Sequence, residues 1–192
     1  QTIVLRPGRG VAPVSVPVET HLPLLAFGAD MKNTFALAHH GQATLHPYIG
    51  DLEHPEAQRI LEASIERELA CHRIDPELVV HDLHPDYFST RMARRFAEGR
   101  GIPALAVQHH HAHLLGAHPG PAIGFAFDGT GFGTDGTIWG GEVLHYDAHG
   151  FERLFHLRPF ALPGGDAAVK APRRVADALL YQIDPAKLEG AP

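Results

Sequence analysis

Apolar residues in the first half of the chain follow strand-like and helix-like patterns in turn. Three short apolar runs, LLAFGA, TFALAH and ATLHPY, are separated by turn residues and predict an antiparallel meander. From His54 to Arg73, apolar residues recur at helical spacing and line one face. The run ELVVHDL predicts a buried parallel strand, a helix follows from near Asp86 to Gly99 or Gly101, and PALAVQ predicts another buried strand. This order of elements predicts an α/β domain with a mixed sheet.

The second half of the chain repeats part of this pattern. After a short helix at about residues 108–117, the runs AIGFAF, TIWGGEVLHY and FERLFHL predict three more strands, and residues 165–182 predict one helix. The segment LAFGADMKNT is similar to the later FAFDGTGFGT, which indicates an internal duplication. We therefore predict an extended arm or linker at 1–22, a first lobe at 23–118, and the start of a second lobe at 119–192. Two such lobes would enclose a cleft.

The composition is that of an ordinary globular protein. Of 192 residues, 44% are apolar and 20% are charged, which is enough to form a core. The net charge of −6 provides no general basic surface for nucleic acid, and no apolar run approaches the roughly 18–20 residues that span a bilayer. The single cysteine, Cys71, excludes an internal disulfide, is typical of a cytoplasmic protein and lies in a pattern that predicts burial. Because the chain begins with Gln1 and ends in PAKLEGAP, we expect a piece of a longer protein.

The densest chemical feature is VQHHHAHLLG, residues 107–116, in which four histidines occupy five positions. His109 and His113 stand at i, i+4, so on a helix they share one face and can offer two imidazoles to one metal. His110 and His113, at i, i+3, are the next-best pair. Glutamate is absent from the second position of the HxxxH pattern, so the metalloprotease motif is excluded. A run of solvated histidines is the structural alternative.

A carboxylate near these histidines would favour the metal. Asp128 follows His113 by 15 residues and lies where a buried strand ends, so it could return to the cleft. The set of His109, His113 and Asp128 combines imidazole and oxygen donors, which suits zinc or iron(II). As a ligand set it is incomplete.

Glycine-rich turns are a second candidate feature. In FDGTGFGTDGTIWGGE, residues 127–142, closely spaced glycines could let backbone N–H groups approach phosphate oxygens, although a simple hairpin explains the pattern equally well. The equivalent first turn, GADMKNTF at residues 28–35, holds Lys32, which could contact a phosphate but is more simply a solvated side chain. The later LPGGD, residues 162–166, precedes a helix and could admit an anion.

The segment VVHDLHPDYFST, residues 79–90, carries His81, Asp82, His84 and Asp86 at the carboxyl end of a predicted strand. Ligands of open α/β sheets gather at such ends. The alternative is a loop between strand and helix in which Asp86 caps the helix. The residues alone leave both interpretations open.

Six of these segments, in this order, resemble the carboxyl-terminal region of the HypF family of hydrogenase-maturation carbamoyltransferases. They are GADMKNTFAL, IGDLEHPE, HDLHPDYFSTRMA, VQHHHAHLLGA, DGTGFGTDGTIWGGEVL and LPGGDAAVKAPRRVA. The resemblance, which runs from about Arg6 to Gln182, implies the duplicated actin/sugar-kinase/heat-shock ATPase (RNase H-like) α/β fold. It also implies a complete first lobe and a truncated second lobe.

The same resemblance implies an activity and a site. The family passes a carbamoyl group from carbamoyl-adenylate, made from ATP by an upstream YrdC-like domain, to the C-terminal cysteine of the partner HypE; dehydration then gives the cyanide ligand of [NiFe]-hydrogenase. It implies His109, His113 and Asp128 as ligands of zinc or iron, with no certain catalytic residue. The implied nucleotide contacts are Lys32, Gly129, Thr130, Gly131, Gly164, Gly165 and Asp166.

Two alternatives to the HypF activity remain open from the sequence. A TsaD-like tRNA threonylcarbamoyl transferase would share the fold, although the acidic net charge and the HHHAH form favour HypF. A non-enzymatic metal-binding module would explain the 16 histidines without any nucleotide. Metal stoichiometry separates storage from enzyme, because a storage protein binds several metals and is unaffected by nucleotide.

Overall fold

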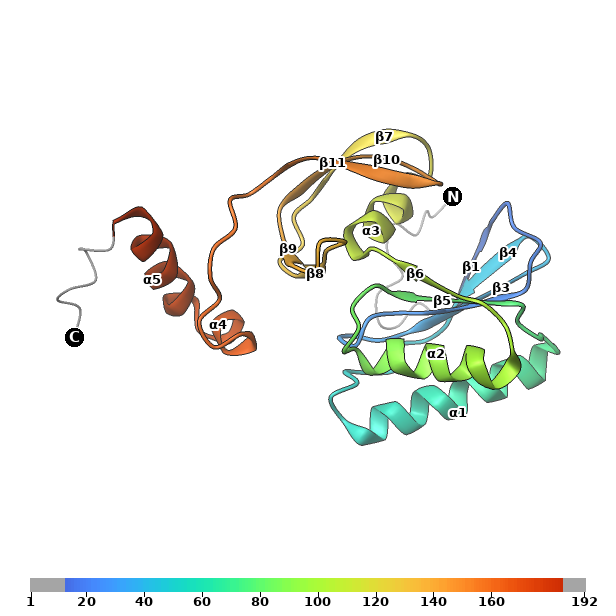
Figure 1. The fold of residues 1–192 in the computed structure, drawn as a ribbon. Helices are drawn as coiled ribbons and strands as arrows, with labels where there is room; N and C mark the ends of the chain where they lie inside the picture. The colour runs from blue at the N-terminus through green and yellow to red at the C-terminus, as the bar shows by residue number, and fades with distance from the viewer. Residues whose placement is uncertain (1–12, 185–192) are drawn as a thin grey trace, which may run out of the picture. The chain divides into compact units, whose positions relative to one another are not determined.

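A computed structural model describes residues 13–184 of the chain (Figure 1). The chain divides between Leu154 and Phe155 into two compact units, which we describe separately. The lobe boundary that we predict near residue 118 lies within the first unit and stays a prediction.

The first unit contains a six-stranded mixed sheet. Its strand order is β1-β4-β3-β2-β5-β6. β2, β3 and β4 form the predicted antiparallel meander, and β5 and β6 add to it in parallel. The first strand lies in the predicted arm and pairs with β4 along one edge. The strands are β1 (Val14–Pro17), β2 (Leu24–Phe27), β3 (Phe35–His39), β4 (Gln42–Leu45), β5 (Leu78–Asp82) and β6 (Ala104–Val107).

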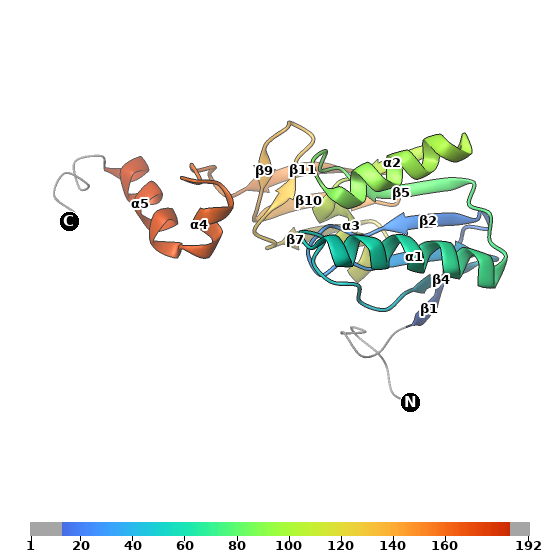
Figure 2. The same cartoon turned by 90° about the horizontal axis from the view of Figure 1, so that it is seen from below.

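Two helices, α1 (Pro55–His72) and α2 (Phe88–Arg100), cover the same face of this sheet (Figures 1 and 2). The predicted helical periodicity is confirmed for Ala57, Leu61, Ile65 and Leu69, which are buried, whereas Ile60, expected on the same face, is exposed. The core is built from aliphatic and aromatic side chains of both layers, including Leu25, Phe27, Phe35, Leu61, Ile65, Val79 and Met92. Packing of the two helices on the sheet fixes the positions of the strand ends.

The helix α2 begins in a way that the sequence did not indicate. Asp86 was the alternative prediction for its cap, but the cap residue is Tyr87, which makes no side-chain capping bond. Instead, the carboxylate of Asp30 accepts hydrogen bonds from the backbone N–H groups of Phe88 and Ser89, at 2.7 and 2.9 Å. Asp30 lies in the turn after β2, so the cap joins this turn to the start of α2 across 58 residues of sequence.

Three predictions of burial in this unit are wrong. The strand that precedes Asp128, predicted to be buried, exposes Ile123 and Phe125. β6 is a parallel strand as predicted, but it lies at the sheet edge, where Ala104 and Leu105 are exposed. Cys71, predicted to be buried, is exposed near the end of α1. An apolar or small residue in a regular pattern does not reveal whether another element covers it.

The rest of the first unit is built around a smaller sheet of order β11-β10-β7, with the hairpin β8-β9 beside it. The helix α3 (His109–Ala117) packs on β7 and β10, where Leu114, Leu144 and Tyr146 form part of a second core. The run TIWGGEVLHY, predicted as one strand, divides into β9 and β10. The elements are β7 (Ala122–Ala126), β8 (Gly131–Phe132), β9 (Ile138–Trp139), β10 (Glu142–Asp147) and β11 (Gly150–His156).

The second unit contains two helices, α4 (Asp166–Lys170) and α5 (Pro172–Ile183), where we predict a single one. The break falls at Pro172, which has no backbone N–H to continue α4 and instead begins α5. Among the described helices, none combines the length and the apolar character that a bilayer crossing needs.

Candidate metal centre

The histidine-rich segment forms the predicted helix, and Gln108 fixes its start. The side-chain oxygen of Gln108 accepts a hydrogen bond from the backbone N–H of His111 at 2.9 Å and caps α3. Its Nε2 donates to the backbone oxygen of Phe132 at 3.2 Å, which ties the helix start to the glycine-rich hairpin. This arrangement places His109 and His113 on one face of the first two turns, toward the loop that follows β7.

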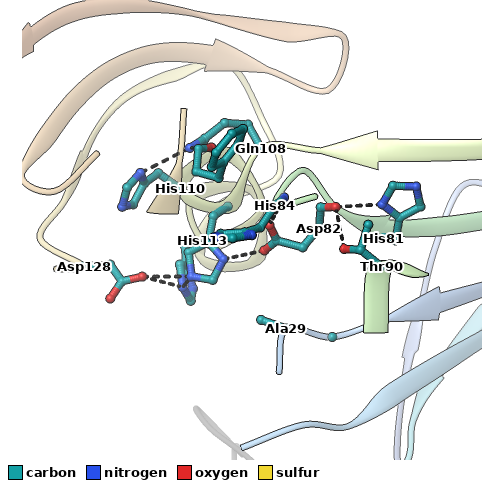
Figure 3. A network of polar contacts seen from close by, with 12 residues as sticks. Ala29, His81, Asp82, His84, Thr90, Gln108, His110, His113 and Asp128 are labelled. Atoms are coloured by element: carbon teal, nitrogen blue, oxygen red, sulfur yellow. Dashed lines mark hydrogen bonds and ion pairs between the residues drawn. The ribbon is translucent and has the colours of Figure 1, made fainter. Parts of the chain in front are cut away.

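His109, His113 and Asp128 come together just after the end of β7. Figure 3 labels His113 and Asp128 of this group. The Nε2 atom of His109 lies 2.8 Å from Oδ2 of Asp128 and 3.1 Å from Nε2 of His113. His113 Nε2 is 3.6 Å from the same carboxylate oxygen. These three ligand atoms all lie within 4.8 Å of one another. The structure therefore gathers the three side chains that the sequence singled out as metal ligands.

The backbone beside Asp128 directs its carboxylate. Oδ1 accepts a hydrogen bond from the N–H of Gly129 at 2.9 Å, and Oδ2 faces the two imidazoles. Two residues further on, a Cβ atom on Gly131 would lie 2.7 Å from Cε1 of His110 and 3.0 Å from Cβ of His109. Only glycine permits this close approach of the loop to α3.

Asp82 completes the environment of His109 from the other side. Its Oδ2 lies 2.6 Å from Nδ1 of His109, and its Oδ1 accepts a hydrogen bond from the N–H of His84 at 2.8 Å. The Asp82 side chain is only 7% exposed. When Nδ1–H donates to Asp82, Nε2 is left to face His113 and Asp128. A carboxylate behind a histidine ligand is the usual outer support of a metal site.

These contacts change the protonation of both partners. The hydrogen bond to Asp82 raises the pKa of His109, burial opposes that rise, and the negative charges of Asp82 and Asp128 add to it. For Asp82, burial acts to raise the pKa, but the hydrogen bonds from His109 and the N–H of His84, together with the histidine charges, leave it lowered. A metal at Nε2 of His109 would compete with a proton for that nitrogen, because the two neighbouring carboxylates favour the protonated ring.

The donor set fits the metal that the resemblance implies. Two imidazole nitrogens and one carboxylate oxygen are ligands that zinc and iron(II) both accept. His109 would bind through Nε2 with its tautomer fixed by Asp82, His113 through Nε2, and Asp128 through Oδ2. Three protein ligands leave room for a substrate oxygen or a further ligand.

The first predicted phosphate turn is held together largely by its own side chains. Asn33 is buried and donates to the backbone oxygens of Gly28 and Ala29, while Thr34 donates to the backbone oxygen of His46. Lys32 has a left-handed backbone with φ of 51° and an exposed side chain. Within this turn, the Lys32 side chain therefore offers a positive charge that a ligand could reach.

The other predicted nucleotide contacts lie on two separate loops. Gly129 and Thr130 are exposed beside Asp128. In the second unit, Gly164 and Gly165 have positive φ values of 87° and 57° and lead into α4, which begins at Asp166. Their contact with a nucleotide remains a prediction.

The part of the site that sequence reasoning missed is the pairing of Asp82 with His109. Asp82 was one of four candidates at the end of β5, and nothing in their order separated it from His81, His84 or Asp86. The signal is the position of the strands, because parallel β5 and β6 end at the same edge and α3 begins directly after β6.

Comparison with known proteins places the chain in a family. Residues 19–118 match the family model described as the HypF Kae1-like domain. Residues 124–191 match the second subdomain of the carbamoyltransferase Kae1-like domain. The chain belongs to the HypF family. The resemblance stated from six sequence segments is confirmed.

Individual relatives agree with this assignment. Carbamoyltransferase HypF2 of Cupriavidus necator is 43% identical over 185 residues, which cover 93% of this chain and 23% of the relative. A crystal structure of full-length HypF in the phosphate- and nucleotide-bound form has a TM-score of 0.82 at 38% identity, covering 89% of this chain and 23% of that one. HypF of T. kodakarensis has the same TM-score at 34% identity, covering 91% and 24%. The fold class is confirmed, and the chain spans about a quarter of these HypF proteins.

Proposed function

We propose that this chain is the carbamoyl-transfer region of a HypF enzyme and that it acts at a metal held by His109, His113 and Asp128. The observation that carries the proposal is the convergence of these ligand atoms within 4.8 Å, with Asp82 behind His109. Relatives that are 43% and 41% identical to this chain over the aligned residues are named carbamoyltransferases, which supports the reaction class.

The proposed donor is carbamoyl-adenylate, made from ATP by a YrdC-like domain of the same protein. The solved HypF that holds phosphate and a nucleotide supports a nucleotide-containing substrate. In this proposal the nucleotide contacts are the predicted set of Lys32, Gly129, Thr130, Gly131, Gly164, Gly165 and Asp166. The exposed Lys32 would supply positive charge, and the exposed loop after Asp128 would supply backbone N–H groups.

The proposed acceptor is the C-terminal cysteine thiol of HypE, on the way to the cyanide ligand of [NiFe]-hydrogenase. The sulfur bonds to the carbamoyl carbon, the bond from that carbon to the adenylate oxygen breaks, and the thiol proton is released. The metal, when bound, supplies a Lewis acid for the carbamoyl carbonyl. His109, His113 and Asp128 would hold this metal. Asp82 accepts the hydrogen bond from Nδ1–H of His109, so that Nε2 is the nitrogen that would face the metal. This reaction needs no nucleophile from the chain itself, so Cys71 has no part in it.

The experiment uses full-length HypF containing this chain, carbamoyl phosphate, ATP and a peptide with the HypE C-terminus. Mass spectrometry of the peptide cysteine should detect a carbamoyl adduct with the native protein and a loss of at least about 100-fold with a His109→Ala, His113→Ala variant. Formation of carbamoyl-adenylate should persist in that variant, because the upstream domain makes it. Equal adduct formation by both proteins would refute the proposed site.

Metal stoichiometry separates this proposal from a storage role. The transferase site predicts about one metal per chain, bound more tightly in the presence of a nucleotide. A storage module predicts several metals and no nucleotide effect. Equilibrium dialysis with zinc, with and without ATP, makes the comparison.

A further inference from the structure

Glu142, the first residue of β10, is a buried carboxylate that the proposed chemistry does not use. It is only 1% exposed. Its Oε1 accepts a hydrogen bond from the backbone N–H of Gly140 at 2.9 Å, and its Oε2 lies 2.6 Å from Nε of Arg153. Both oxygens are therefore engaged, and burial of this charge is compensated by a guanidinium.

Arg153, on β11, connects this carboxylate to the hairpin β8-β9. Its guanidinium lies over the ring of Trp139, 4.1 Å from the centroid, and 3.5 Å from Oδ2 of Asp135. The indole Nε1 of Trp139 donates to Oδ1 of Asp135 at 2.9 Å. Together these contacts hold the far end of the glycine-rich loop as one packed group.

Gly140 packs against Gly129, the residue that follows Asp128. A Cβ atom on Gly140 would lie 2.6 Å from the backbone oxygen of Gly129 and 3.3 Å from that of Asp128. The backbone of Gly140 therefore packs directly against the peptide that follows the metal ligand. The hydrogen bond from Gly140 to Glu142 fixes one side of this contact.

We propose that Glu142 is a positioning residue for the metal centre. It holds Gly140 against Gly129 and so sets where the carboxylate of Asp128 stands relative to His109. The inference rests on the proposed metal function, because Asp128 is the residue being positioned. Glu142 touches no reacting group, and its contribution passes through the hydrogen bond to Gly140.

Zinc affinity of the full chain, measured by competition with a chromophoric chelator, tests this inference. Glu142→Ala should weaken zinc binding about 10- to 100-fold, the range seen when an outer support of a metal ligand is removed. A Glu142→Gln variant keeps an oxygen for the N–H of Gly140 and leaves Arg153 in place over Trp139, so its affinity should stay within about threefold of the native value. Loss of affinity in Glu142→Gln equal to that of Glu142→Ala would overturn the role of this hydrogen bond.

Two further variants keep the result interpretable. Leu61→Ala opens a cavity in the core against α1, so it should lower the melting temperature and leave zinc affinity unchanged. If Glu142→Ala does not fold, Gly140→Ala should still weaken zinc binding, because the new methyl group pushes on Gly129 while the ion pair of Glu142 and Arg153 is retained. Native affinity in Gly140→Ala would contradict the inference.

Amide hydrogen exchange in metal-free protein distinguishes failure of this inference from failure of the proposed function. Absence of zinc binding by the native chain would refute the function. In that case the N–H of Gly129, which bonds to Asp128, decides the positioning role. Its exchange should be faster in Glu142→Ala and native-like in Leu61→Ala. An unchanged rate in Glu142→Ala would show that Glu142 does not position this peptide.

Discussion

The Nδ1 atom of His109 lies 2.6 Å from Oδ2 of Asp82, a residue that precedes it by 27 positions. Asp82 ends β5, and His109 begins α3 directly after the neighbouring strand β6. The parallel pairing of β5 with β6 thus creates the contact. It leaves Nε2 of His109 facing Asp128 and His113, so the fold itself selects the nitrogen available to a metal.

We predict that Asp82→Asn weakens zinc binding about 10- to 100-fold. The amide lacks the negative charge that supports the Nδ1 proton, so the pKa of His109 should also fall in metal-free protein. Isothermal titration with zinc and an NMR pH titration of His109 measure the two effects. Asp86→Asn is the matched control, since the exposed Asp86 side chain lies in the same loop; equal losses from both variants would contradict the role of Asp82.

A second prediction concerns the start of α2. Asp30→Ala removes the carboxylate that accepts hydrogen bonds from Phe88 and Ser89, and should lower the free energy of unfolding by about 0.5–2 kcal/mol. Asp86→Ala should change it by less than about 0.5 kcal/mol. Urea denaturation of the two variants provides the comparison, and a larger loss from Asp86→Ala would assign the cap to the local residue after all.

Asp30 and Asp82 show which features of the fold and the site the sequence can predict and which it cannot. The periodicity of α1, the meander of β2–β4 and the extent of α3 are local properties, so they are readable from residue spacing. The cap at α2 and the support of His109 come from residues 58 and 27 positions away, and depend on which strands are adjacent. Local residue spacing does not predict which strands are neighbours in the sheet.

The candidate metal ligands could be predicted from the sequence because their signals are local. His109 and His113 lie on one turn of one helix, so their spacing alone predicts the pair. Asp128 could be proposed because it follows a predicted strand, although that strand, β7, exposes Ile123 and Phe125 and is not buried as expected. Glu142 gave no signal of its own, since its role depends on Gly140, on Arg153 and on a contact with the opposite side of the loop.

Two glycines are predicted to respond oppositely to the same substitution. Gly133→Ala places a methyl group into the indole of Trp139 and should destabilise the protein by about 1–3 kcal/mol. Gly99→Ala, on the exposed face of α2 with open space around it, should stabilise by about 0.5–1 kcal/mol. Chemical denaturation measures both, and similar values for the two would contradict the close packing of the hairpin.

The pH dependence of stability should depend in part on His46. Burial lowers its pKa from the ordinary 6.5, although the carboxylate of Glu68 opposes the shift. The unfolded chain therefore binds a proton at this residue more readily than the folded chain does. As a result, its contribution to the free energy of unfolding is greatest above pH 6.5 and decreases as the pH falls through that value.

The variant His46→Phe isolates this contribution. Phenylalanine keeps an aromatic ring against Phe35, on which His46 stacks with centroids 4.4 Å apart, and cannot titrate. Between pH 7.5 and 5.5, the native protein should lose more stability than the variant does. Equal losses, measured by denaturation at both values, would show that His46 is protonated as easily in the folded state as in the unfolded one.

The central claim is that His109, His113 and Asp128 form a metal site, and metal content tests it most directly. Elemental analysis should find about one zinc or iron per native chain and almost none in His109→Ala, His113→Ala, while circular dichroism shows the same fold. A His118→Ala, His145→Ala variant, which removes two exposed histidines, should keep its metal. Unchanged metal content in the His109, His113 variant would contradict the claim.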